Sequence, residues 1–238
     1  MNTLADLQRM PRFLVSWPFV AAISILLAPE ALSQAGSKVQ LRIVSFPKSL
    51  DPKPVELVVG EGKTIEVETP SSEISKTYTV PAQSTWTLGR EGVGEDGKPE
   101  FEVFGKARAL SSSKQLLILI RKGAENEDGF AVIPVEFQPS GFGKGKMLFL
   151  NAASVAIAGD VGERKFALKP GEMEIISPKP DKTGRLCQAI LYYDKEGEAE
   201  PFFSSKWPLS DKARGLIFVY HGEDNKKLRL HAIRDFLP

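Results

Sequence analysis

Two stretches of the chain decide the fold: Phe104–Phe137, FGKARALSSSKQLLILIRKGAENEDGFAVIPVEF, and Phe203–Phe236, FSSKWPLSDKARGLIFVYHGEDNKKLRLHAIRDF. They align without a gap at an offset of 99 residues. Each runs from an aromatic residue through Leu-Ser, an apolar segment and a turn with Gly and Asn to an acidic residue before Phe. The identical pairs are Phe104/Phe203, Leu110/Leu209, Ser111/Ser210, Leu117/Leu216, Ile118/Ile217, Gly123/Gly222, Asn126/Asn225 and Phe137/Phe236. Such self-similarity predicts a duplicated structural unit.

The spacing of apolar residues predicts strands in both units. Val55–Val59 and Thr64–Thr69 flank the turn Gly60-Glu61-Gly62 and predict a hairpin. Leu116–Ile120 is apolar throughout, which is typical of a central strand covered on both faces. No stretch after the first 35 residues has the period of an amphipathic helix. We therefore expect an all-β protein.

Turns at short intervals, with seven or eight strands expected in each unit of about a hundred residues, predict two tandem sandwich domains. The sequence leaves immunoglobulin-like and jelly-roll-like topologies open. The expected divisions are a signal peptide over residues 1–35, a first sandwich over 36–137, a linker over 138–145 and a second sandwich over 146–238. The linker, QPSGFGKG, has the Gly-rich composition of a flexible connection.

The N-terminal segment has the layout of a secretory signal peptide. Arg9 and Arg12 precede the uncharged run Phe13–Leu27, and the small residues Ser33 and Ala35 follow it. The run is shorter than the roughly 20 residues that span a bilayer. We expect an exported, periplasmic or extracellular protein whose mature chain has no stable transmembrane segment. A retained anchor is the alternative.

Composition bounds the chemistry. Lys and Arg number 31 and Asp and Glu 30, a balance that disfavours nucleic acid as a partner. The single cysteine, Cys187, can form no internal disulfide and lies far from the leader, where a lipid-attachment cysteine would stand. Its apolar surroundings predict a buried, unreactive thiol. We expect the fold to need neither a metal nor any other cofactor.

Three patterns that could carry chemistry lack the required spacing. His221 and His231 would lie about 13 Å apart on a strand pair, too far to share a metal ion. The acidic cluster Glu125–Gly129 does not match a calcium loop, and Gly141–Lys146 does not match a phosphate-binding loop. No catalytic residue or metal ligand is predicted.

Aromatic residues supply the one candidate binding surface: Tyr192, Tyr193, Phe202 and Trp207. Tyr192 and Tyr193 are adjacent on a predicted strand, so one of them should point outward. Exposed rings could stack on a sugar or a protein partner. Alternatively, Phe203 and Trp207 close the end of the sandwich core, as Phe104 would in the first unit.

The second unit contains Phe149-Leu150-Asn151-Ala152-Ala153-Ser154 and, later, Phe166-Ala167-Leu168-Lys169-Pro170-Gly171. These runs resemble a class of exported bacterial sandwich domains that mostly have no assigned function. The resemblance covers roughly thirty residues per unit, and Ser45 stands where Asn is expected in the first unit. It implies an envelope location and a non-enzymatic role.

Three functions remain open. The leading expectation is a non-enzymatic binding or structural module of the cell envelope, with an envelope protein or a glycan as partner. The alternative is a hydrolase or metal-dependent enzyme whose site assembles from dispersed acids and His231. A third is an accessory subunit that lends an edge strand to a larger assembly.

Overall fold

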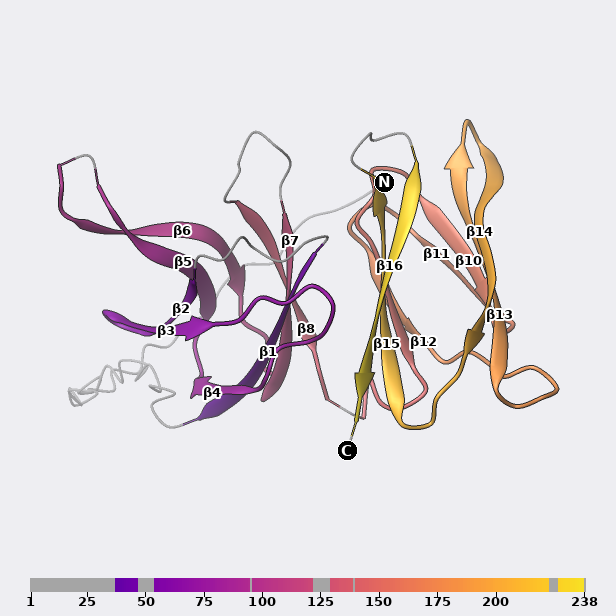
Figure 1. Ribbon diagram of the computed structural model, residues 1–238, viewed down its shortest axis with the longest axis horizontal. Helices are drawn as coiled ribbons and strands as arrows, with labels where there is room; N and C mark the ends of the chain where they lie inside the picture. The colour runs from indigo at the N-terminus through magenta and orange to yellow at the C-terminus, as the bar shows by residue number, and fades with distance from the viewer. Residues whose placement is uncertain are drawn as a thin grey trace, which may run out of the picture. The chain divides into compact units, whose positions relative to one another are not determined.

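The computed structural model describes residues 37–46, 54–94, 96–121, 129–138, 140–222 and 227–237, which belong to one compact unit (Figure 1). The predicted signal peptide and most of the acidic turn, residues 125–128, lie outside the described residues. Over the described ranges every regular element is a β-strand. None of the described residues forms a helix with the length and apolarity to cross a membrane.

The first unit has eight strands in two four-stranded sheets with orders β4-β1-β7-β8 and β3-β2-β5-β6. Their bounds are β1 Lys38–Phe46, β2 Val55–Gly60, β3 Lys63–Val67, β4 Tyr78–Pro81, β5 Thr85–Val93, β6 Pro99–Arg108, β7 Lys114–Arg121 and β8 Phe130–Glu136. The predicted hairpin is confirmed as β2 and β3. Its turn needs glycine at Gly62, where φ is +62°.

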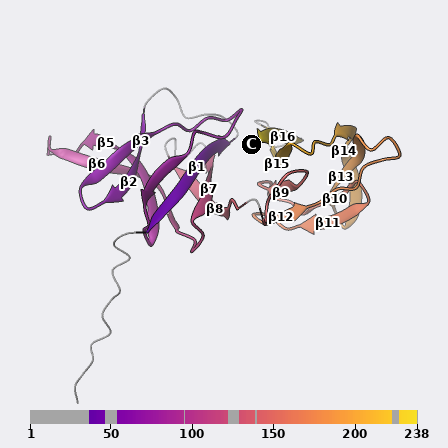
Figure 2. The ribbon, with the colours of Figure 1, turned by 90° about the horizontal axis from the view of Figure 1, so that it is seen from below.

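The second unit repeats this plan, with sheet orders β12-β9-β15-β16 and β11-β10-β13-β14 (Figure 2). Its strands are β9 Met147–Asn151, β10 Ile157–Val161, β11 Arg164–Leu168, β12 Met173–Ile176, β13 Leu186–Lys195, β14 Glu198–Pro208, β15 Ala213–His221 and β16 Leu228–Phe236. In both units the first strand pairs in parallel with the seventh, β1 with β7 and β9 with β15. The chain is therefore all-β, with two sandwich-like units of one topology.

Strand β7 is apolar throughout because two different cores cover its faces. Leu117 and Leu119 point into the core between the sheets of the first unit. Leu116 and Ile118 point the other way, into a core shared with the second unit. The predicted burial on both faces is confirmed, and the second sandwich supplies the cover.

Strand β15 follows the same rule, and it corrects the alignment of the repeats. Leu216 and Phe218 line the shared core, whereas Ile217 and Val219 line the core of the second unit. Leu216 thus corresponds to Leu116 and not to Leu117, so the offset in this strand is 100 residues. A slip of one residue exchanges the faces of a strand.

The strands that pair with β7 and β15, namely β8 and β16, depart from the offset of 99 residues in the opposite direction. Leu116 pairs with Val135 and Leu216 with Ile233, which is an offset of 98 residues. The turn after β7 is therefore two residues longer than the turn after β15. The gapless offset of 99 residues lies midway between the offset of 100 for β7 and β15 and the offset of 98 for β8 and β16. The different lengths of the two turns account for these two offsets.

A charged cluster lies beside the shared core. The carboxylate of Asp235 accepts hydrogen bonds from Arg42 Nη1 and Arg214 Nε, each at 2.9 Å. Arg42 also donates to the carbonyls of Ile74 and Ser75. Asp235 and Arg214 are both buried. One carboxylate thus connects a strand of the first unit with two strands of the second.

The predicted linker, residues 138–145, lies between β8 and β9. Phe142 within it is fully buried in the shared core. Arg214 Nη1 donates to the Phe142 carbonyl at 2.6 Å, and its guanidinium carbon lies 3.3 Å from the ring centroid of Phe137. The connection is therefore packed, despite a composition typical of flexible segments.

Candidate functional site

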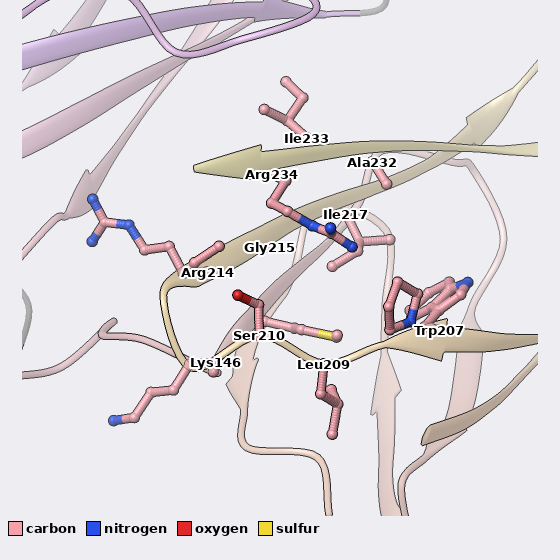
Figure 3. A pocket seen from close by; sticks show the side chains of 14 residues that line it. Lys146, Trp207, Leu209, Ser210, Arg214, Gly215, Ile217, Ala232, Ile233 and Arg234 are labelled. Atoms are coloured by element: carbon pink, nitrogen blue, oxygen red, sulfur yellow. The ribbon is translucent and has the colours of Figure 1, made fainter. Parts of the chain in front are cut away.

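A cavity of about 330 Å³ opens in the second sandwich between the end of β14 and the edge strand β16 (Figure 3). Its floor comes from β9 and β15, which lie side by side in one sheet. The volume is at the lower end of the range for small-molecule sites. The lining residues on which the argument rests are Met147, Trp207, Ser210, Gly215, Ile217 and Arg234.

The cavity exists where the second unit has a glycine and the first has a glutamine. Gln115 pairs with Glu136 across β7 and β8, and Gly215 pairs with Arg234 across β15 and β16. The buried amide of Gln115 donates to the carbonyls of Leu110 and Ser112, both at 2.8 Å. The side chain of Gln115 therefore fills the space that Gly215 leaves open.

A tryptophan also changes strands between the units. In the first unit Trp86 lies on β5 opposite Ala107, and its indole N–H donates to Gln115 Oε1 at 2.9 Å. In the second unit Cys187 lies on β13 opposite Trp207 of β14. Matching bonds, Ala109 N–H to Ser84 O and Leu209 N–H to Arg185 O, fix this equivalence. Trp207 consequently forms a wall of the cavity, whereas Trp86 is sealed inside the first core.

The four aromatic residues predicted as a binding surface do not lie together. Trp207 alone lines the cavity, and it packs on Phe149 and Phe203 at ring-centroid distances of 6.1 and 5.5 Å. Tyr193 and Phe202 form a T-shaped pair at 6.2 Å. Tyr192 is partly exposed and lies at a bulge in the β13–β14 ladder. Because strand residues advance about 3.3 Å each, Trp207 and Phe202 lie well apart.

Phe203 and Trp207 are both partly buried against the second core, and Phe104 is buried in the first. Each of these three rings packs against the core of its own unit. Trp207 has both roles, because one part of it packs on the core and another faces the cavity.

The two histidines make separate contacts. His221 Nε2 lies 2.9 Å from Ser154 Oγ, and its Nδ1 is buried with no hydrogen-bond partner among the described residues. His231 Nε2 donates to the Ser71 carbonyl at 2.7 Å, and its ring lies against Phe46 and Phe218. Residues of the first sandwich thus partly cover His231. In the described part of the chain, no three His, Cys, Asp or Glu side chains form a metal-binding group.

Cys187 is buried in the second core, as its apolar neighbours predict. Burial raises the pKa of its thiol, and the negative charge of Asp181 adds to the rise. Less thiolate forms at neutral pH, so the group is a poor nucleophile.

The residues that open the cavity were missed from the sequence. The gapless alignment sets Gly215 against Leu116 and Arg234 against Val135, a change that suggests only a poorer strand. With each strand in its own register, glycine replaces a buried glutamine and arginine replaces a glutamate. Shifting each strand separately to keep apolar residues on one face would have supplied this signal.

Comparison with models of known protein families and with curated proteins gave no match to this chain.

Proposed function

We propose that this protein is a non-enzymatic binding module of the cell envelope whose ligand enters the cavity of the second sandwich. The observation that carries the proposal is the contrast between the two units. The same topology is closed by Gln115 in the first unit and opened by Gly215 in the second. The cavity therefore accompanies specific differences in an otherwise preserved plan: a glycine where the first unit has Gln115, and a tryptophan on β14 where the first unit has one on β5.

The envelope location rests on the three-part leader over residues 1–35. Fractionation of cells that produce the full chain with a C-terminal tag tests it. Recovery in the periplasmic or extracellular fraction supports export, whereas recovery in the cytoplasm with the leader uncut contradicts it.

Binding is tested by a thermal-shift screen of the purified protein against envelope glycans and small metabolites of each charge class. Every hit is repeated on Gly215→Gln, which restores the residue of the first unit. A Cβ at Gly215 would lie 3.3 Å from Ile217 Cδ1 and 3.4 Å from Met147 Cγ, and both are atoms of flexible side chains. Gly92→Gln is the matched control, because a Cβ there would meet its nearest neighbour at 3.6 Å.

A shift that disappears in Gly215→Gln and persists in Gly92→Gln supports the proposal. Ala232→Phe fills the cavity from the opposite strand and serves as a second blocked variant, because Ala232 lines the cavity and is exposed. Hits that bind both blocked variants normally, or a screen with no hit, would overturn the cavity as the binding site.

The alternative function, a hydrolase, has one observation in its favour: the contact between Ser154 Oγ and His221 Nε2. A serine nucleophile needs a base at this distance and, in the usual triad, a carboxylate on the other ring nitrogen. The described residues place no carboxylate on His221 Nδ1. Labelling by a fluorophosphonate probe that is lost in Ser154→Ala would establish the hydrolase, and absence of labelling would reject it.

A further inference from the structure

The charged residues that line the cavity are all positive. Its lining contains Lys146, Arg214 and Arg234, and none of the lining residues that the structure describes is acidic. A low-dielectric wall beside uncompensated positive charge attracts anions. The positive charge of the lining therefore favours an anionic ligand.

Two of the three cations are already engaged. Arg214 bonds to Asp235 and to the Phe142 carbonyl, and Lys146 Nζ donates to the Gly141 carbonyl at 2.8 Å. Figure 3 shows both of these side chains pointing away from the cavity, while Arg234 extends toward Ile217 and Trp207. Among the described residues the side chain of Arg234 makes neither a hydrogen bond nor an ion pair. Its guanidinium is thus the unpaired positive group among the described residues that line the cavity.

The rest of the cavity is apolar and includes a broad ring. Ile217 and Met147 form the floor beside Gly215, and Trp207 forms a wall. Contacts with Phe149 and Phe203 hold the indole in place, so that its orientation is set before any ligand binds. A flat apolar group is the natural complement of such a wall.

The first unit shows that the charge is a departure from the shared plan. The position that pairs with Gln115 is Glu136, and the position that pairs with Gly215 is Arg234. The same strand-edge position thus carries opposite charges in the two units. The glycine that opens the cavity and the arginine that gives it a positive charge are direct neighbours across one strand pair.

From these observations we infer that the cavity binds a small organic anion, whose carboxylate or sulfonate pairs with Arg234 and whose flat apolar body lies against Trp207 and Ile217. The inference rests on the proposed function, since it names the ligand class of the same cavity. The planar guanidinium can donate two parallel hydrogen bonds to a carboxylate, which adds orientation to the attraction.

Three naphthalene probes of nearly equal shape test the charge: 1-naphthoate, the neutral 1-naphthamide and the cationic 1-naphthylmethylammonium. Their affinities for the purified protein are measured by titration calorimetry, with quenching of tryptophan fluorescence as a second signal. A charge-assisted hydrogen bond predicts that the anion binds about tenfold or more tightly than the amide, with the cation weakest.

The variants assign that preference to one residue. Arg234→Gln should bring the anion and the amide to the same affinity, and Arg234→Lys should retain part of the difference. Arg229→Gln is the matched control, because Arg229 is an exposed residue of β16 outside the cavity lining. It should leave all three affinities unchanged.

The outcomes separate the two proposals. An amide that binds as tightly as the anion, with both lost in Ala232→Phe, overturns the charge inference and leaves the cavity as a binding site. A preference for the anion that survives Arg234→Gln also overturns it. If no probe binds while the screen yields cavity ligands of another class, the inference falls and the proposed function stands. If no probe binds and the screen yields no ligand, both fall.

Discussion

The two sandwiches share one topology but differ at the end of their central strands. In the first, Gln115 and Trp86 fill this end with a hydrogen-bonded pair of buried side chains. In the second, Gly215 leaves the corresponding end open between β14 and β16. The comparison shows that a duplicated scaffold can keep one copy for packing while the other acquires a cavity.

The largest effect is expected at Asp235, which the first unit does not reproduce. Asp235→Ala removes the carboxylate shared by Arg42 and Arg214 and leaves a buried guanidinium without its counter-charge. We expect the free energy of unfolding to fall by about 3–5 kcal/mol. Urea denaturation measures this loss. Asp96→Ala, which breaks an exposed ion pair with Lys98, is the control and should leave the midpoint in place.

Leu117 and Leu216 test whether the shared core is as well packed as the individual cores. Both side chains are fully buried, Leu117 within the first sandwich and Leu216 in the shared core. Each Leu→Ala variant should lose about 2–5 kcal/mol of stability. Leu110→Ala, at a half-exposed site, should cost clearly less in the same denaturation experiment. A Leu216→Ala loss as small as that of Leu110→Ala would contradict the shared core.

Gln115→Gly would give the first unit the glycine of the second. The Trp86 indole N–H would then be buried without its acceptor, and we expect a loss of about 1–3 kcal/mol. Gln115→Glu keeps an acceptor for the indole but loses both donations to the Leu110 and Ser112 carbonyls, so it should lose stability as well. Near-ultraviolet circular dichroism would report the changed environment of Trp86. An unchanged spectrum and an unchanged midpoint would show that the glutamine does not close this end.

Gly215→Ala should change stability by less than about 1 kcal/mol. Glycine weakens a strand by roughly 0.5–1 kcal/mol, which the substitution recovers. The new methyl group would press on Ile217 and Met147, whose side chains can move into the adjacent cavity. A small rise in melting temperature is the expected result. A fall of several degrees would show that the floor of the cavity is rigid.

The smallest effect is expected at Cys187, whose thiol should not react in the native protein. Because burial raises the pKa of the Cys187 thiol, a disulfide reagent such as DTNB should not react with the native protein at neutral pH. One equivalent of thiol should appear after unfolding in urea. Rapid labelling of the native state would contradict the burial of Cys187 in the second core.

The fold could be predicted because its signals are local. The apolar run Leu116–Ile120 and the hairpin turn at Gly62 each depend on residues near one another in sequence. The candidate site could not be predicted in the same way. Whether Gly215 faces a cavity depends on a register that differs by one residue, and on the side chains of β14 and β16.

The aromatic prediction shows the same limit. Tyr192, Tyr193, Phe202 and Trp207 are close in sequence, yet a bulge and the length of β14 separate Trp207 from the others. The shared core was missed for a related reason. The apolar run of β7 indicated that both faces are covered, but nothing in that run identifies the second sandwich as the cover.

The parallel pairing of the first and seventh strands has a consequence for how each sandwich is made. Ile43 meets Leu117, and Phe149 meets Ile217, only after most of a unit has been synthesised. Contacts that close such long loops slow folding, because chain entropy is lost before the contacts form. Each unit of a nascent chain therefore lacks the pairing of its first strand until its seventh strand has been synthesised, so that the sandwich is completed late.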